Sequence, residues 1–208
     1  RLDEERLREK SKITPVHRNR ASMIGDACER RLFLWRTAWR DASPPETTLQ
    51  AIFDEGNLHE LDTVRRLASM GIRIERSQMS FEFGGITGHI DGSATDDETG
   101  QPVLVEIKSV SPRAFPRLRT AEDVKNAHGS LAYTQKWFSQ VQIYLLGSNP
   151  AYASGVLVLK NKLTGRLWPI PMALDYDYAD GLLKKSERVD AAVASGVAPP
   201  FVEDHDEC

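Results

Sequence analysis

The sequence predicts an α/β fold in which a central mixed β-sheet is flanked by helices. Two observations support this: apolar residues recur at spacings of three and four in long segments, and shorter apolar runs lie between these segments. The 208 residues are enough for one domain with a sizeable core. The predicted helices are residues 22–39, 47–69, 130–146 and 175–195, and the predicted strands are residues 72–76, 79–84, 86–94, 102–109, 153–160 and 166–171.

The chain starts with a charged segment, residues 1–12, that has little apolar surface, so we expect at most a loosely held helix there. The first long helix is predicted over residues 22–39, where Leu and Trp supply apolar contacts, and a Pro-Pro pair follows its end. We assign residues 1–45 to an N-terminal helical entry segment, residues 46–196 to the core of a single domain, and residues 197–208 to an acidic C-terminal tail.

The second helix, residues 47–69, starts at a Thr that can serve as N-cap and is closed by Gly71. Its apolar stripe also contains Gly56, which costs a helix roughly 1 kcal/mol relative to Ala and so indicates that something passes close to the backbone. His59 lies on the same stripe. Taken alone, it fits a buried core histidine better than a metal ligand, and the adjacent Glu60 is a secondary candidate ligand.

The strands that follow include a hairpin over residues 86–110, with residues 97–100 (Asp-Glu-Thr-Gly) as its turn. If this tetrad is the loop, the numbers of paired residues sum to 197, which places Asp91 opposite Glu106. Side chains alternate between the two faces of a strand, so Lys108 shares a face with Glu106. The opposite face carries Val103, Val105 and Ile107.

Two carboxylates and a lysine thus converge on an otherwise apolar, central-type strand. Burying two unpaired carboxylates costs on the order of several kcal/mol each, so a lysine with a hydrogen-bond network or a divalent cation must compensate. A surface ladder of salt bridges is the simpler interpretation of such a pattern. The flanking Gly88 and Gly92, which bracket Asp91, and the apolar context of Glu106 favour a functional site instead.

After Pro112, a basic segment extends to Asn126 and either meets phosphates or forms a solvated connector. The helix over residues 130–146 carries an aromatic and amide stripe that suits stacking on unpaired bases, although for its two aromatic residues nearest the start interior packing is the simpler interpretation. Residues 163–165 form the turn of a second hairpin, and the amphipathic helix 175–195 covers the sheet. The stripe consists of Tyr133, Trp137, Gln140 and Tyr144.

The composition is that of a soluble globular protein, with 40% hydrophobic residues, 27% charged residues and a formal net charge of −3. There is no apolar run long enough for a membrane span and no visible signal peptide, so we expect a cytoplasmic protein. The two cysteines, Cys28 and Cys208, cannot build a disulfide framework. Local basic clusters that include Arg30, Arg31 and Arg113 are candidate contacts for DNA.

Residues 88–92 (Gly-His-Ile-Asp-Gly) followed by residues 105–109 (Val-Glu-Ile-Lys-Ser) resemble the PD-(D/E)XK nuclease superfamily, and more narrowly its RecB-type exonuclease branch. That branch adds a GxxH element upstream and a QxxxY element downstream. Both occur here in the expected order, at residues 56–59 and 140–144. The resemblance spans about residues 20–195, and it implies a restriction-endonuclease-like core.

The resemblance also implies roles. Lys108 would position or help to deprotonate the attacking water, while Gln140 and Tyr144 would order the site and hold DNA. In relatives with an iron–sulfur cluster, a cysteine at the place of Cys28 is one ligand, and three more lie near the C-terminus. Because Cys208 is the last residue, a cluster is expected only if cysteines beyond residue 208 exist. The implied Mg²⁺ or Mn²⁺ ligands are His59, Asp91, Glu106 and the backbone carbonyl of Ile107.

The function expected from these features is that of a metal-dependent DNA exonuclease that hydrolyses phosphodiester bonds, favours single-stranded ends and belongs to phage, repair or CRISPR machinery. Three alternatives stay open: an endonuclease, a CRISPR-adaptation or repair nuclease that trims DNA with a protein partner, and a catalytically inactive DNA-binding or assembly module. The intact set of acids and lysine argues against the last. No membrane partner is expected.

Overall fold

The structure, a computed structural model, describes residues 2–149 and 151–201. Within these residues, a four-stranded sheet of order β4-β5-β6-β7 lies next to a three-stranded sheet of order β1-β3-β2. In the larger sheet β5 and β6 are parallel and the outer pairs are antiparallel, which confirms the predicted mixed sheet. The strands are β1 (Asn19–Arg20), β2 (Met79–Phe83), β3 (Ile86–Ile90), β4 (Gly92–Thr95), β5 (Pro102–Val110), β6 (Ser154–Asn161) and β7 (Leu167–Met172).

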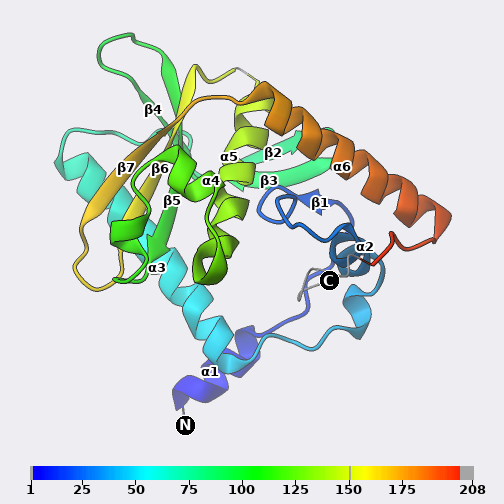
Figure 1. Cartoon of the computed structure of the whole chain (residues 1–208). Helices are drawn as coiled ribbons and strands as arrows, with labels where there is room; N and C mark the ends of the chain where they lie inside the picture. Colours follow the sequence, from blue (N-terminus) through cyan, green and yellow to red (C-terminus); the bar gives the residue numbers. More distant parts are fainter. Residues whose placement is uncertain (1, 150, 202–208) are drawn as a thin grey trace.

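Helices α3 and α5 flank the four-stranded sheet, and α6 packs on α2 and α5 (Figure 1). Val64 of α3 joins a small apolar cluster on one face, whereas Val141 and Leu145 of α5 pack against Gly155 of β6 on the other. No helix within the described residues is long and apolar enough to cross a membrane. The helices are α1 (Leu2–Lys10), α2 (Glu29–Thr37), α3 (Thr47–Ser69), α4 (Ala121–Lys125), α5 (Gln135–Gly147) and α6 (Tyr176–Ser195), and the 3-10 turns are η1 (Trp39–Asp41), η2 (Phe115–Arg117) and η3 (Gly129–Thr134).

Both faces of β5 are covered, which explains why its sequence is an almost continuous apolar run. Val105 and Ile107 belong to the cluster on the α3 side, and Leu104 and Val110 belong to the larger core on the α5 side. Glu106 alternates with these apolar residues and therefore points toward α5. A carboxylate thus enters the interior in the middle of the sheet.

The register of the β4–β5 hairpin agrees with the prediction. The pairs run from Gly92 with Val105 to Thr95 with Pro102, so the paired numbers sum to 197. Asp96 stabilises the turn, because its Oδ1 accepts a hydrogen bond from the backbone N–H of Thr99 at 2.7 Å. The turn is therefore specified by local side-chain chemistry.

Two predicted strands differ from the structure. The segment 72–76 is not a strand and contributes a single bridge, between Glu75 and Ser93. The predicted strand 86–94 is divided at Asp91, so that β3 joins the three-stranded sheet and β4 the four-stranded one. The segment 72–76 packs closely on the residue after the break, because a Cβ at Gly92 would lie only 2.3 Å from Ile74 Cγ2.

The predicted helix 22–39 starts only at Glu29. Before it, β1 pairs in parallel with β3, and the chain then turns past Gly25, where a Cβ would lie 2.3 Å from Ser139 Oγ of α5. Cys28 is the N-cap of α2, and its Sγ accepts a hydrogen bond from the backbone N–H of Arg31 at 3.3 Å. A further correction concerns the predicted helix 130–146, whose first residues form the 3-10 turn η3.

Candidate active site

A hollow of about 680 Å³ lies at the carboxyl end of β5, between α3 and α5, and is called the central hollow below. Its floor is formed by the break between β3 and β4 together with the end of β5. Its two walls come from α3 and from the η3–α5 segment. The residues that define it are Asp91, Ile107, Lys108 and Ser109 on the floor, Ile52, Phe53, Gly56, Asn57 and Glu60 on α3, Tyr133, Lys136, Trp137 and Gln140 on the opposite wall, and Ser22 and Lys162 at its margin.

Asp91 reaches the floor because the chain leaves one sheet there and enters the other. The last backbone pair between β4 and β5 at this end is Gly92 with Val105. Beyond this pair, the Asp91 carboxylate and not a strand lies against the edge of β5. Its Oδ2 accepts the backbone N–H of Ile107 at 2.8 Å. The N–H and C=O of one strand residue leave the same edge, so the Ile107 carbonyl also faces this edge.

Glu106 is fully buried, with 0% of its surface exposed. Its Oε1 accepts a hydrogen bond from Lys108 Nζ at 2.5 Å, whereas its Oε2 is buried and has no hydrogen-bond partner among the described residues. Burial raises the pKa of Glu106 to about 8, with Asp91 adding to the effect and Lys108 opposing it. For Lys108, burial lowers the pKa, but the neighbouring carboxylates outweigh it and raise the pKa overall.

Helix α3 contributes a third carboxylate, Glu60. Burial and the charge of Asp91 raise its pKa, which indicates that the two acids share one electrostatic environment. Gln78 ties them together: its Nε2 donates to Glu60 Oε1 at 2.6 Å, and its backbone N–H donates to the Asp91 carbonyl at 3.3 Å. Gln78 does this from a left-handed backbone conformation, φ +55°, which is strained for a residue with a side chain.

Asp91, Ile107 and Lys108 lie together on the floor of the hollow, and Glu106, which does not line it, is buried beside Lys108. Glu60 lines the central hollow and His59 is absent from the residues that line it. Burial lowers the pKa of His59, and the charged groups that influence it are those of two lysines and two acids outside the floor of the hollow: Lys160, Lys162, Glu55 and Asp62.

A divalent cation fits the donor chemistry of the floor. Carboxylate and carbonyl oxygens are the ligands that Mg²⁺ and Mn²⁺ prefer, and the orphaned Oε2 of Glu106 is a buried acceptor that such an ion would satisfy. Among residues 2–149 and 151–201, however, no group of three His, Cys, Asp or Glu side chains is close enough to hold a metal ion. The carboxylates of Asp91 and Glu60 would therefore have to move closer to Glu106 to bind one ion together.

Gln140 and Tyr144 lie beside the floor but are buried, with 5% and 1% of their surfaces exposed. Gln140 Nε2 donates to Tyr144 Oη at 3.2 Å, and Tyr144 Oη donates to the carbonyl of His89 at 2.8 Å. Gly88 makes this contact possible, because a Cβ there would lie 2.5 Å from Tyr144 Oη. These two residues hold α5 against β3, the strand that leads into Asp91.

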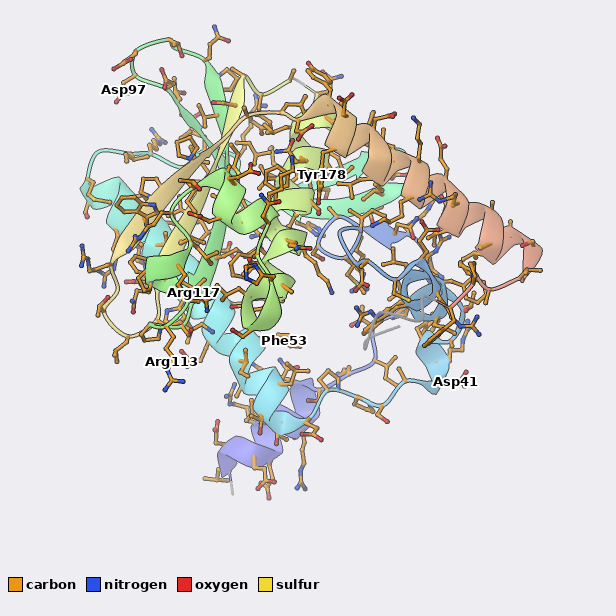
Figure 2. The ribbon with its side chains drawn as sticks, in the orientation of Figure 1. Asp41, Phe53, Asp97, Arg113, Arg117 and Tyr178 are labelled. Atoms are coloured by element: carbon orange, nitrogen blue, oxygen red, sulfur yellow. The ribbon has the colours of Figure 1, made fainter. Side chains whose placement is uncertain are left out.

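The predicted DNA-contacting arginines lie in two places. Arg30 donates to the carbonyl of Pro199 at 3.0 Å, and Arg31 forms an ion pair with Asp26 at 2.7 Å, so both make contacts within the protein. Arg113 is exposed and points outward from the loop that follows β5 (Figure 2). Of the two cysteines, Cys28 is fully buried, while residue 208 lies outside the described residues.

Three residues of the site were not singled out from the sequence: Gln78, Lys136 and Lys162. Lys136 precedes Gln140 by one helical turn, so helical spacing could have placed it on the same wall. Lys162 follows β6 immediately, and no pattern within the strand indicates that it reaches the hollow. Gln78 depends on a left-handed backbone that nothing in its sequence neighbourhood requires.

Solved structures share this architecture. The alkaline exonuclease LHK-Exo from Laribacter hongkongensis superposes with a TM-score of 0.56 at 13% sequence identity, over 92% of this chain and 93% of that one. LHK-Exo in complex with dAMP gives a TM-score of 0.57 at 13% identity, over 90% and 93% of the two chains. The protein SSO0001 gives a TM-score of 0.52 at 18% identity, over 91% of this chain and 84% of its own.

No protein-family model and no curated protein matches the sequence. At identities of 13% to 18%, the structural similarity establishes the fold. The strand order, the parallel pairing of β5 with β6 and the flanking helices are consistent with this similarity. The chain therefore has the α/β fold of LHK-Exo, and the fold that the resemblance in its sequence predicted is confirmed.

Proposed function

We propose that this chain is a metal-dependent deoxyribonuclease that hydrolyses phosphodiester bonds as an exonuclease, with a preference for single-stranded ends. The observation that supports this most is that Asp91 and Lys108 line one hollow, while Glu106 is buried beside Lys108 and keeps an oxygen without a partner among the described residues. The likeness to LHK-Exo, which is described as an alkaline exonuclease and has been solved with dAMP, points in the same direction.

In this proposal Asp91, Glu106 and the Ile107 carbonyl hold Mg²⁺ or Mn²⁺. When bound, the ion neutralises charge on the scissile phosphate and lowers the pKa of a coordinated water. For the remaining ligand we favour Glu60 over His59, because Glu60 lines the hollow and its pKa responds to Asp91. Gln78 acts as a positioning residue that keeps the Glu60 carboxylate turned toward the floor.

Lys108 has an electrostatic role. Its raised pKa keeps the ammonium protonated at neutral pH, which favours stabilisation of charge on a phosphate oxygen over removal of a proton from water. The ion pair with Glu106 holds the ammonium at the floor of the hollow. Gln140 lines the same hollow, but its Oε1 is buried, so we assign it a role in positioning α5 beside the floor, while the exposed Arg113 contacts phosphates farther along the strand.

The decisive experiment uses end-labelled single-stranded and duplex DNA with Mn²⁺ or with EDTA, and resolves the products by size. We expect metal-dependent release of mononucleotides from single-stranded ends, whereas internal fragments would assign an endonuclease. Asp91→Ala should abolish cleavage and leave DNA binding intact. Asp97→Ala is a matched control, since Asp97 sits at the tip of the β4–β5 hairpin, far from Phe53 in the hollow (Figure 2). DNA binding by the wild type without cleavage would contradict the proposal.

A further inference from the structure

Large apolar side chains are exposed on both walls of the central hollow. On α3, Ile52 is 50% exposed and Phe53 is 49% exposed, and on the opposite wall Tyr133 is 48% exposed. Exposed apolar side chains scattered singly over a surface need no explanation, but a group of them around one concave site marks a surface that binds something. These three flank a floor that carries carboxylates and a lysine.

The aromatic side chains are held in place. Tyr133 and Trp137 form an edge-to-face pair with ring centroids 5.4 Å apart and an interplanar angle of 83°, and Trp137 in turn packs on the main core. Phe53 projects from α3 toward the η3–α5 wall (Figure 2). Between the walls the backbone of α3 is open at Gly56, where a Cβ would meet nothing within 4 Å. A flat ring thus has both space to enter and aromatic surfaces to contact.

The charges in the hollow suit a phosphodiester chain. Lys108, Lys136 and Lys162 all line it, from the floor, the α5 wall and the turn after β6. Alternation of cationic groups with aromatic faces is the pattern by which proteins bind single-stranded nucleic acid. A duplex keeps its bases stacked in pairs and offers mainly phosphates and groove edges to a protein, so it would leave these apolar walls uncovered.

We propose that Ile52, Phe53, Tyr133 and Trp137 form a stacking cleft that binds the unpaired bases at the end of a single DNA strand, and that this cleft selects single-stranded over duplex ends. The inference rests on the proposed nuclease function, since it takes the carboxylate floor as the place where the strand is cut. Phe53 and Tyr133 stack on bases, and the exposed Lys162 at the margin of the hollow contacts the phosphates that join them.

The test is equilibrium binding of a fluorescently labelled oligothymidine to the full chain, by anisotropy in EDTA so that no cleavage occurs. Phe53→Ala and Tyr133→Ala should each weaken binding about 5- to 150-fold, the range for loss of one base stack. Leu49→Ala is the matched control, because Leu49 is 43% exposed on the same helix and does not line the hollow. Tyr133→Phe keeps the ring and should bind like the wild type.

A strand that carries abasic sites at its end separates stacking from a structural effect. The wild type should bind it more weakly than the intact strand, and Phe53→Ala should bind the abasic strand with the same affinity as the wild type does. The stacking cleft is contradicted if both alanine variants bind the intact strand as tightly as the wild type does. It is also contradicted if the variants lose as much affinity for the abasic strand as for the intact strand. Tighter binding of blunt duplex than of single strands contradicts it too.

Cleavage with Mn²⁺, measured in parallel, distinguishes this inference from the nuclease proposal. Efficient cleavage of single strands by the wild type and by Phe53→Ala alike would contradict the stacking cleft alone. Base-dependent binding without any metal-dependent cleavage would support the cleft and contradict the nuclease proposal alone.

Discussion

Asp26 and Glu106 are both buried carboxylates, with 1% and 0% of their surfaces exposed, yet their surroundings differ. Asp26 is satisfied on both oxygens: Arg31 and Lys136 donate to its carboxylate at 2.8 and 2.7 Å, and the backbone N–H of Cys28 donates at 3.0 Å. Glu106 has one cationic partner, Lys108, and an oxygen without any partner among the described residues.

The pKa shifts of the two groups have opposite signs. Burial pushes the pKa of Asp26 upward, but the hydrogen bonds from Arg31 and Lys136 outweigh it and the pKa is lowered. Burial also pushes the pKa of Glu106 upward, and there Lys108 offsets only part of the effect. A buried carboxylate with a complete set of partners fixes the structure, here by joining α2 to α5. One with an incomplete set retains the capacity to bind a cation.

The substitution Glu106→Gln is the strongest test of this difference between Glu106 and Asp26. We expect at least ~10³-fold slower cleavage, because the substitution removes the charge proposed to bind the metal ion. Above pH 8, where Glu106 is ionised, the metal-free variant should unfold at the same or a higher temperature, since a neutral amide still accepts from Lys108 and costs less to bury than a carboxylate. Initial rates with Mn²⁺ and thermal unfolding in EDTA measure the two effects. Cleavage at more than a tenth of the wild-type rate would show that the unsatisfied oxygen has no catalytic role.

Asp26→Ala should have the opposite effect. Removing this carboxylate takes away the anion that Arg31 and Lys136 share, and because both cations are partly exposed we expect a loss of ~1–3 kcal/mol. Urea unfolding at neutral pH gives the loss directly. The contrast predicts that the folded fraction of this variant still cleaves DNA within roughly tenfold of the wild type, whereas Glu106→Gln is folded and inactive.

The two carboxylates also predict opposite pH dependence for the metal-free protein. The pKa of Glu106 is raised to about 8, so its contribution to stability is fully present below its ordinary value of 4.5 and is lost as pH rises through 8. The lowered pKa of Asp26 means that its contribution is present above its ordinary value of 3.8 and is lost as pH falls. Thermal unfolding from pH 3 to pH 9 measures both.

Divalent cations sharpen this prediction. Since a cation binds the ionised form of Glu106, Mn²⁺ should raise the unfolding temperature more at pH 8 than at pH 5. In Glu106→Gln the unfolding temperature should no longer fall as pH rises toward 8. The fall in unfolding temperature at acid pH, which depends on Asp26, should remain. A Mn²⁺ effect that is equal at both pH values would contradict a metal site at Glu106.

The substitution Gln78→Gly separates the effect of backbone strain at residue 78 from the proposed role of its amide in positioning Glu60. Glycine adopts the left-handed backbone readily, so the variant should gain up to about 1 kcal/mol of stability. Loss of the amide frees the Glu60 carboxylate, and groups that orient metal ligands are typically worth 10- to 100-fold in affinity or activity. We therefore expect a weaker apparent affinity for Mn²⁺, measured by calorimetry, in a more stable protein. A Gln78→Asn variant that restores the affinity would support positioning through the amide.

Local chemistry explains which parts of the site the sequence could predict. The turn at residues 97–100 and the alternation along β5 fix the register, so Asp91 and Glu106 could be placed together in advance. His59 and Glu60 are neighbours on one helix and point about 100° apart. Which of them faces the hollow depends on how α3 packs against the sheet, and periodicity alone does not determine that rotation.

The features that the sequence did not predict depend on distant partners. The segment before α2 contains Asp26, whose second cation, Lys136, lies far along the chain on α5. The break between β3 and β4 lies beside Gly92, which packs closely on Ile74. The short β1 strand has two residues and exists because β3 lies beside it.

The last comparison uses two glycines, one in each region. Gly56 lines the hollow with open space around its Cβ position, so Gly56→Ala should gain up to about 1 kcal/mol from helix propensity. Gly25 is adjacent to Asp26, and a Cβ there would lie 2.3 Å from Ser139 Oγ, so Gly25→Ala should lose ~1–3 kcal/mol by overpacking. Thermal unfolding of the two variants compares them directly. If the hollow is an open binding site and the region around Asp26 is closely packed, the two substitutions must shift stability in opposite directions. Equal losses of stability would show that α3 is as closely packed at Gly56 as the turn is at Gly25.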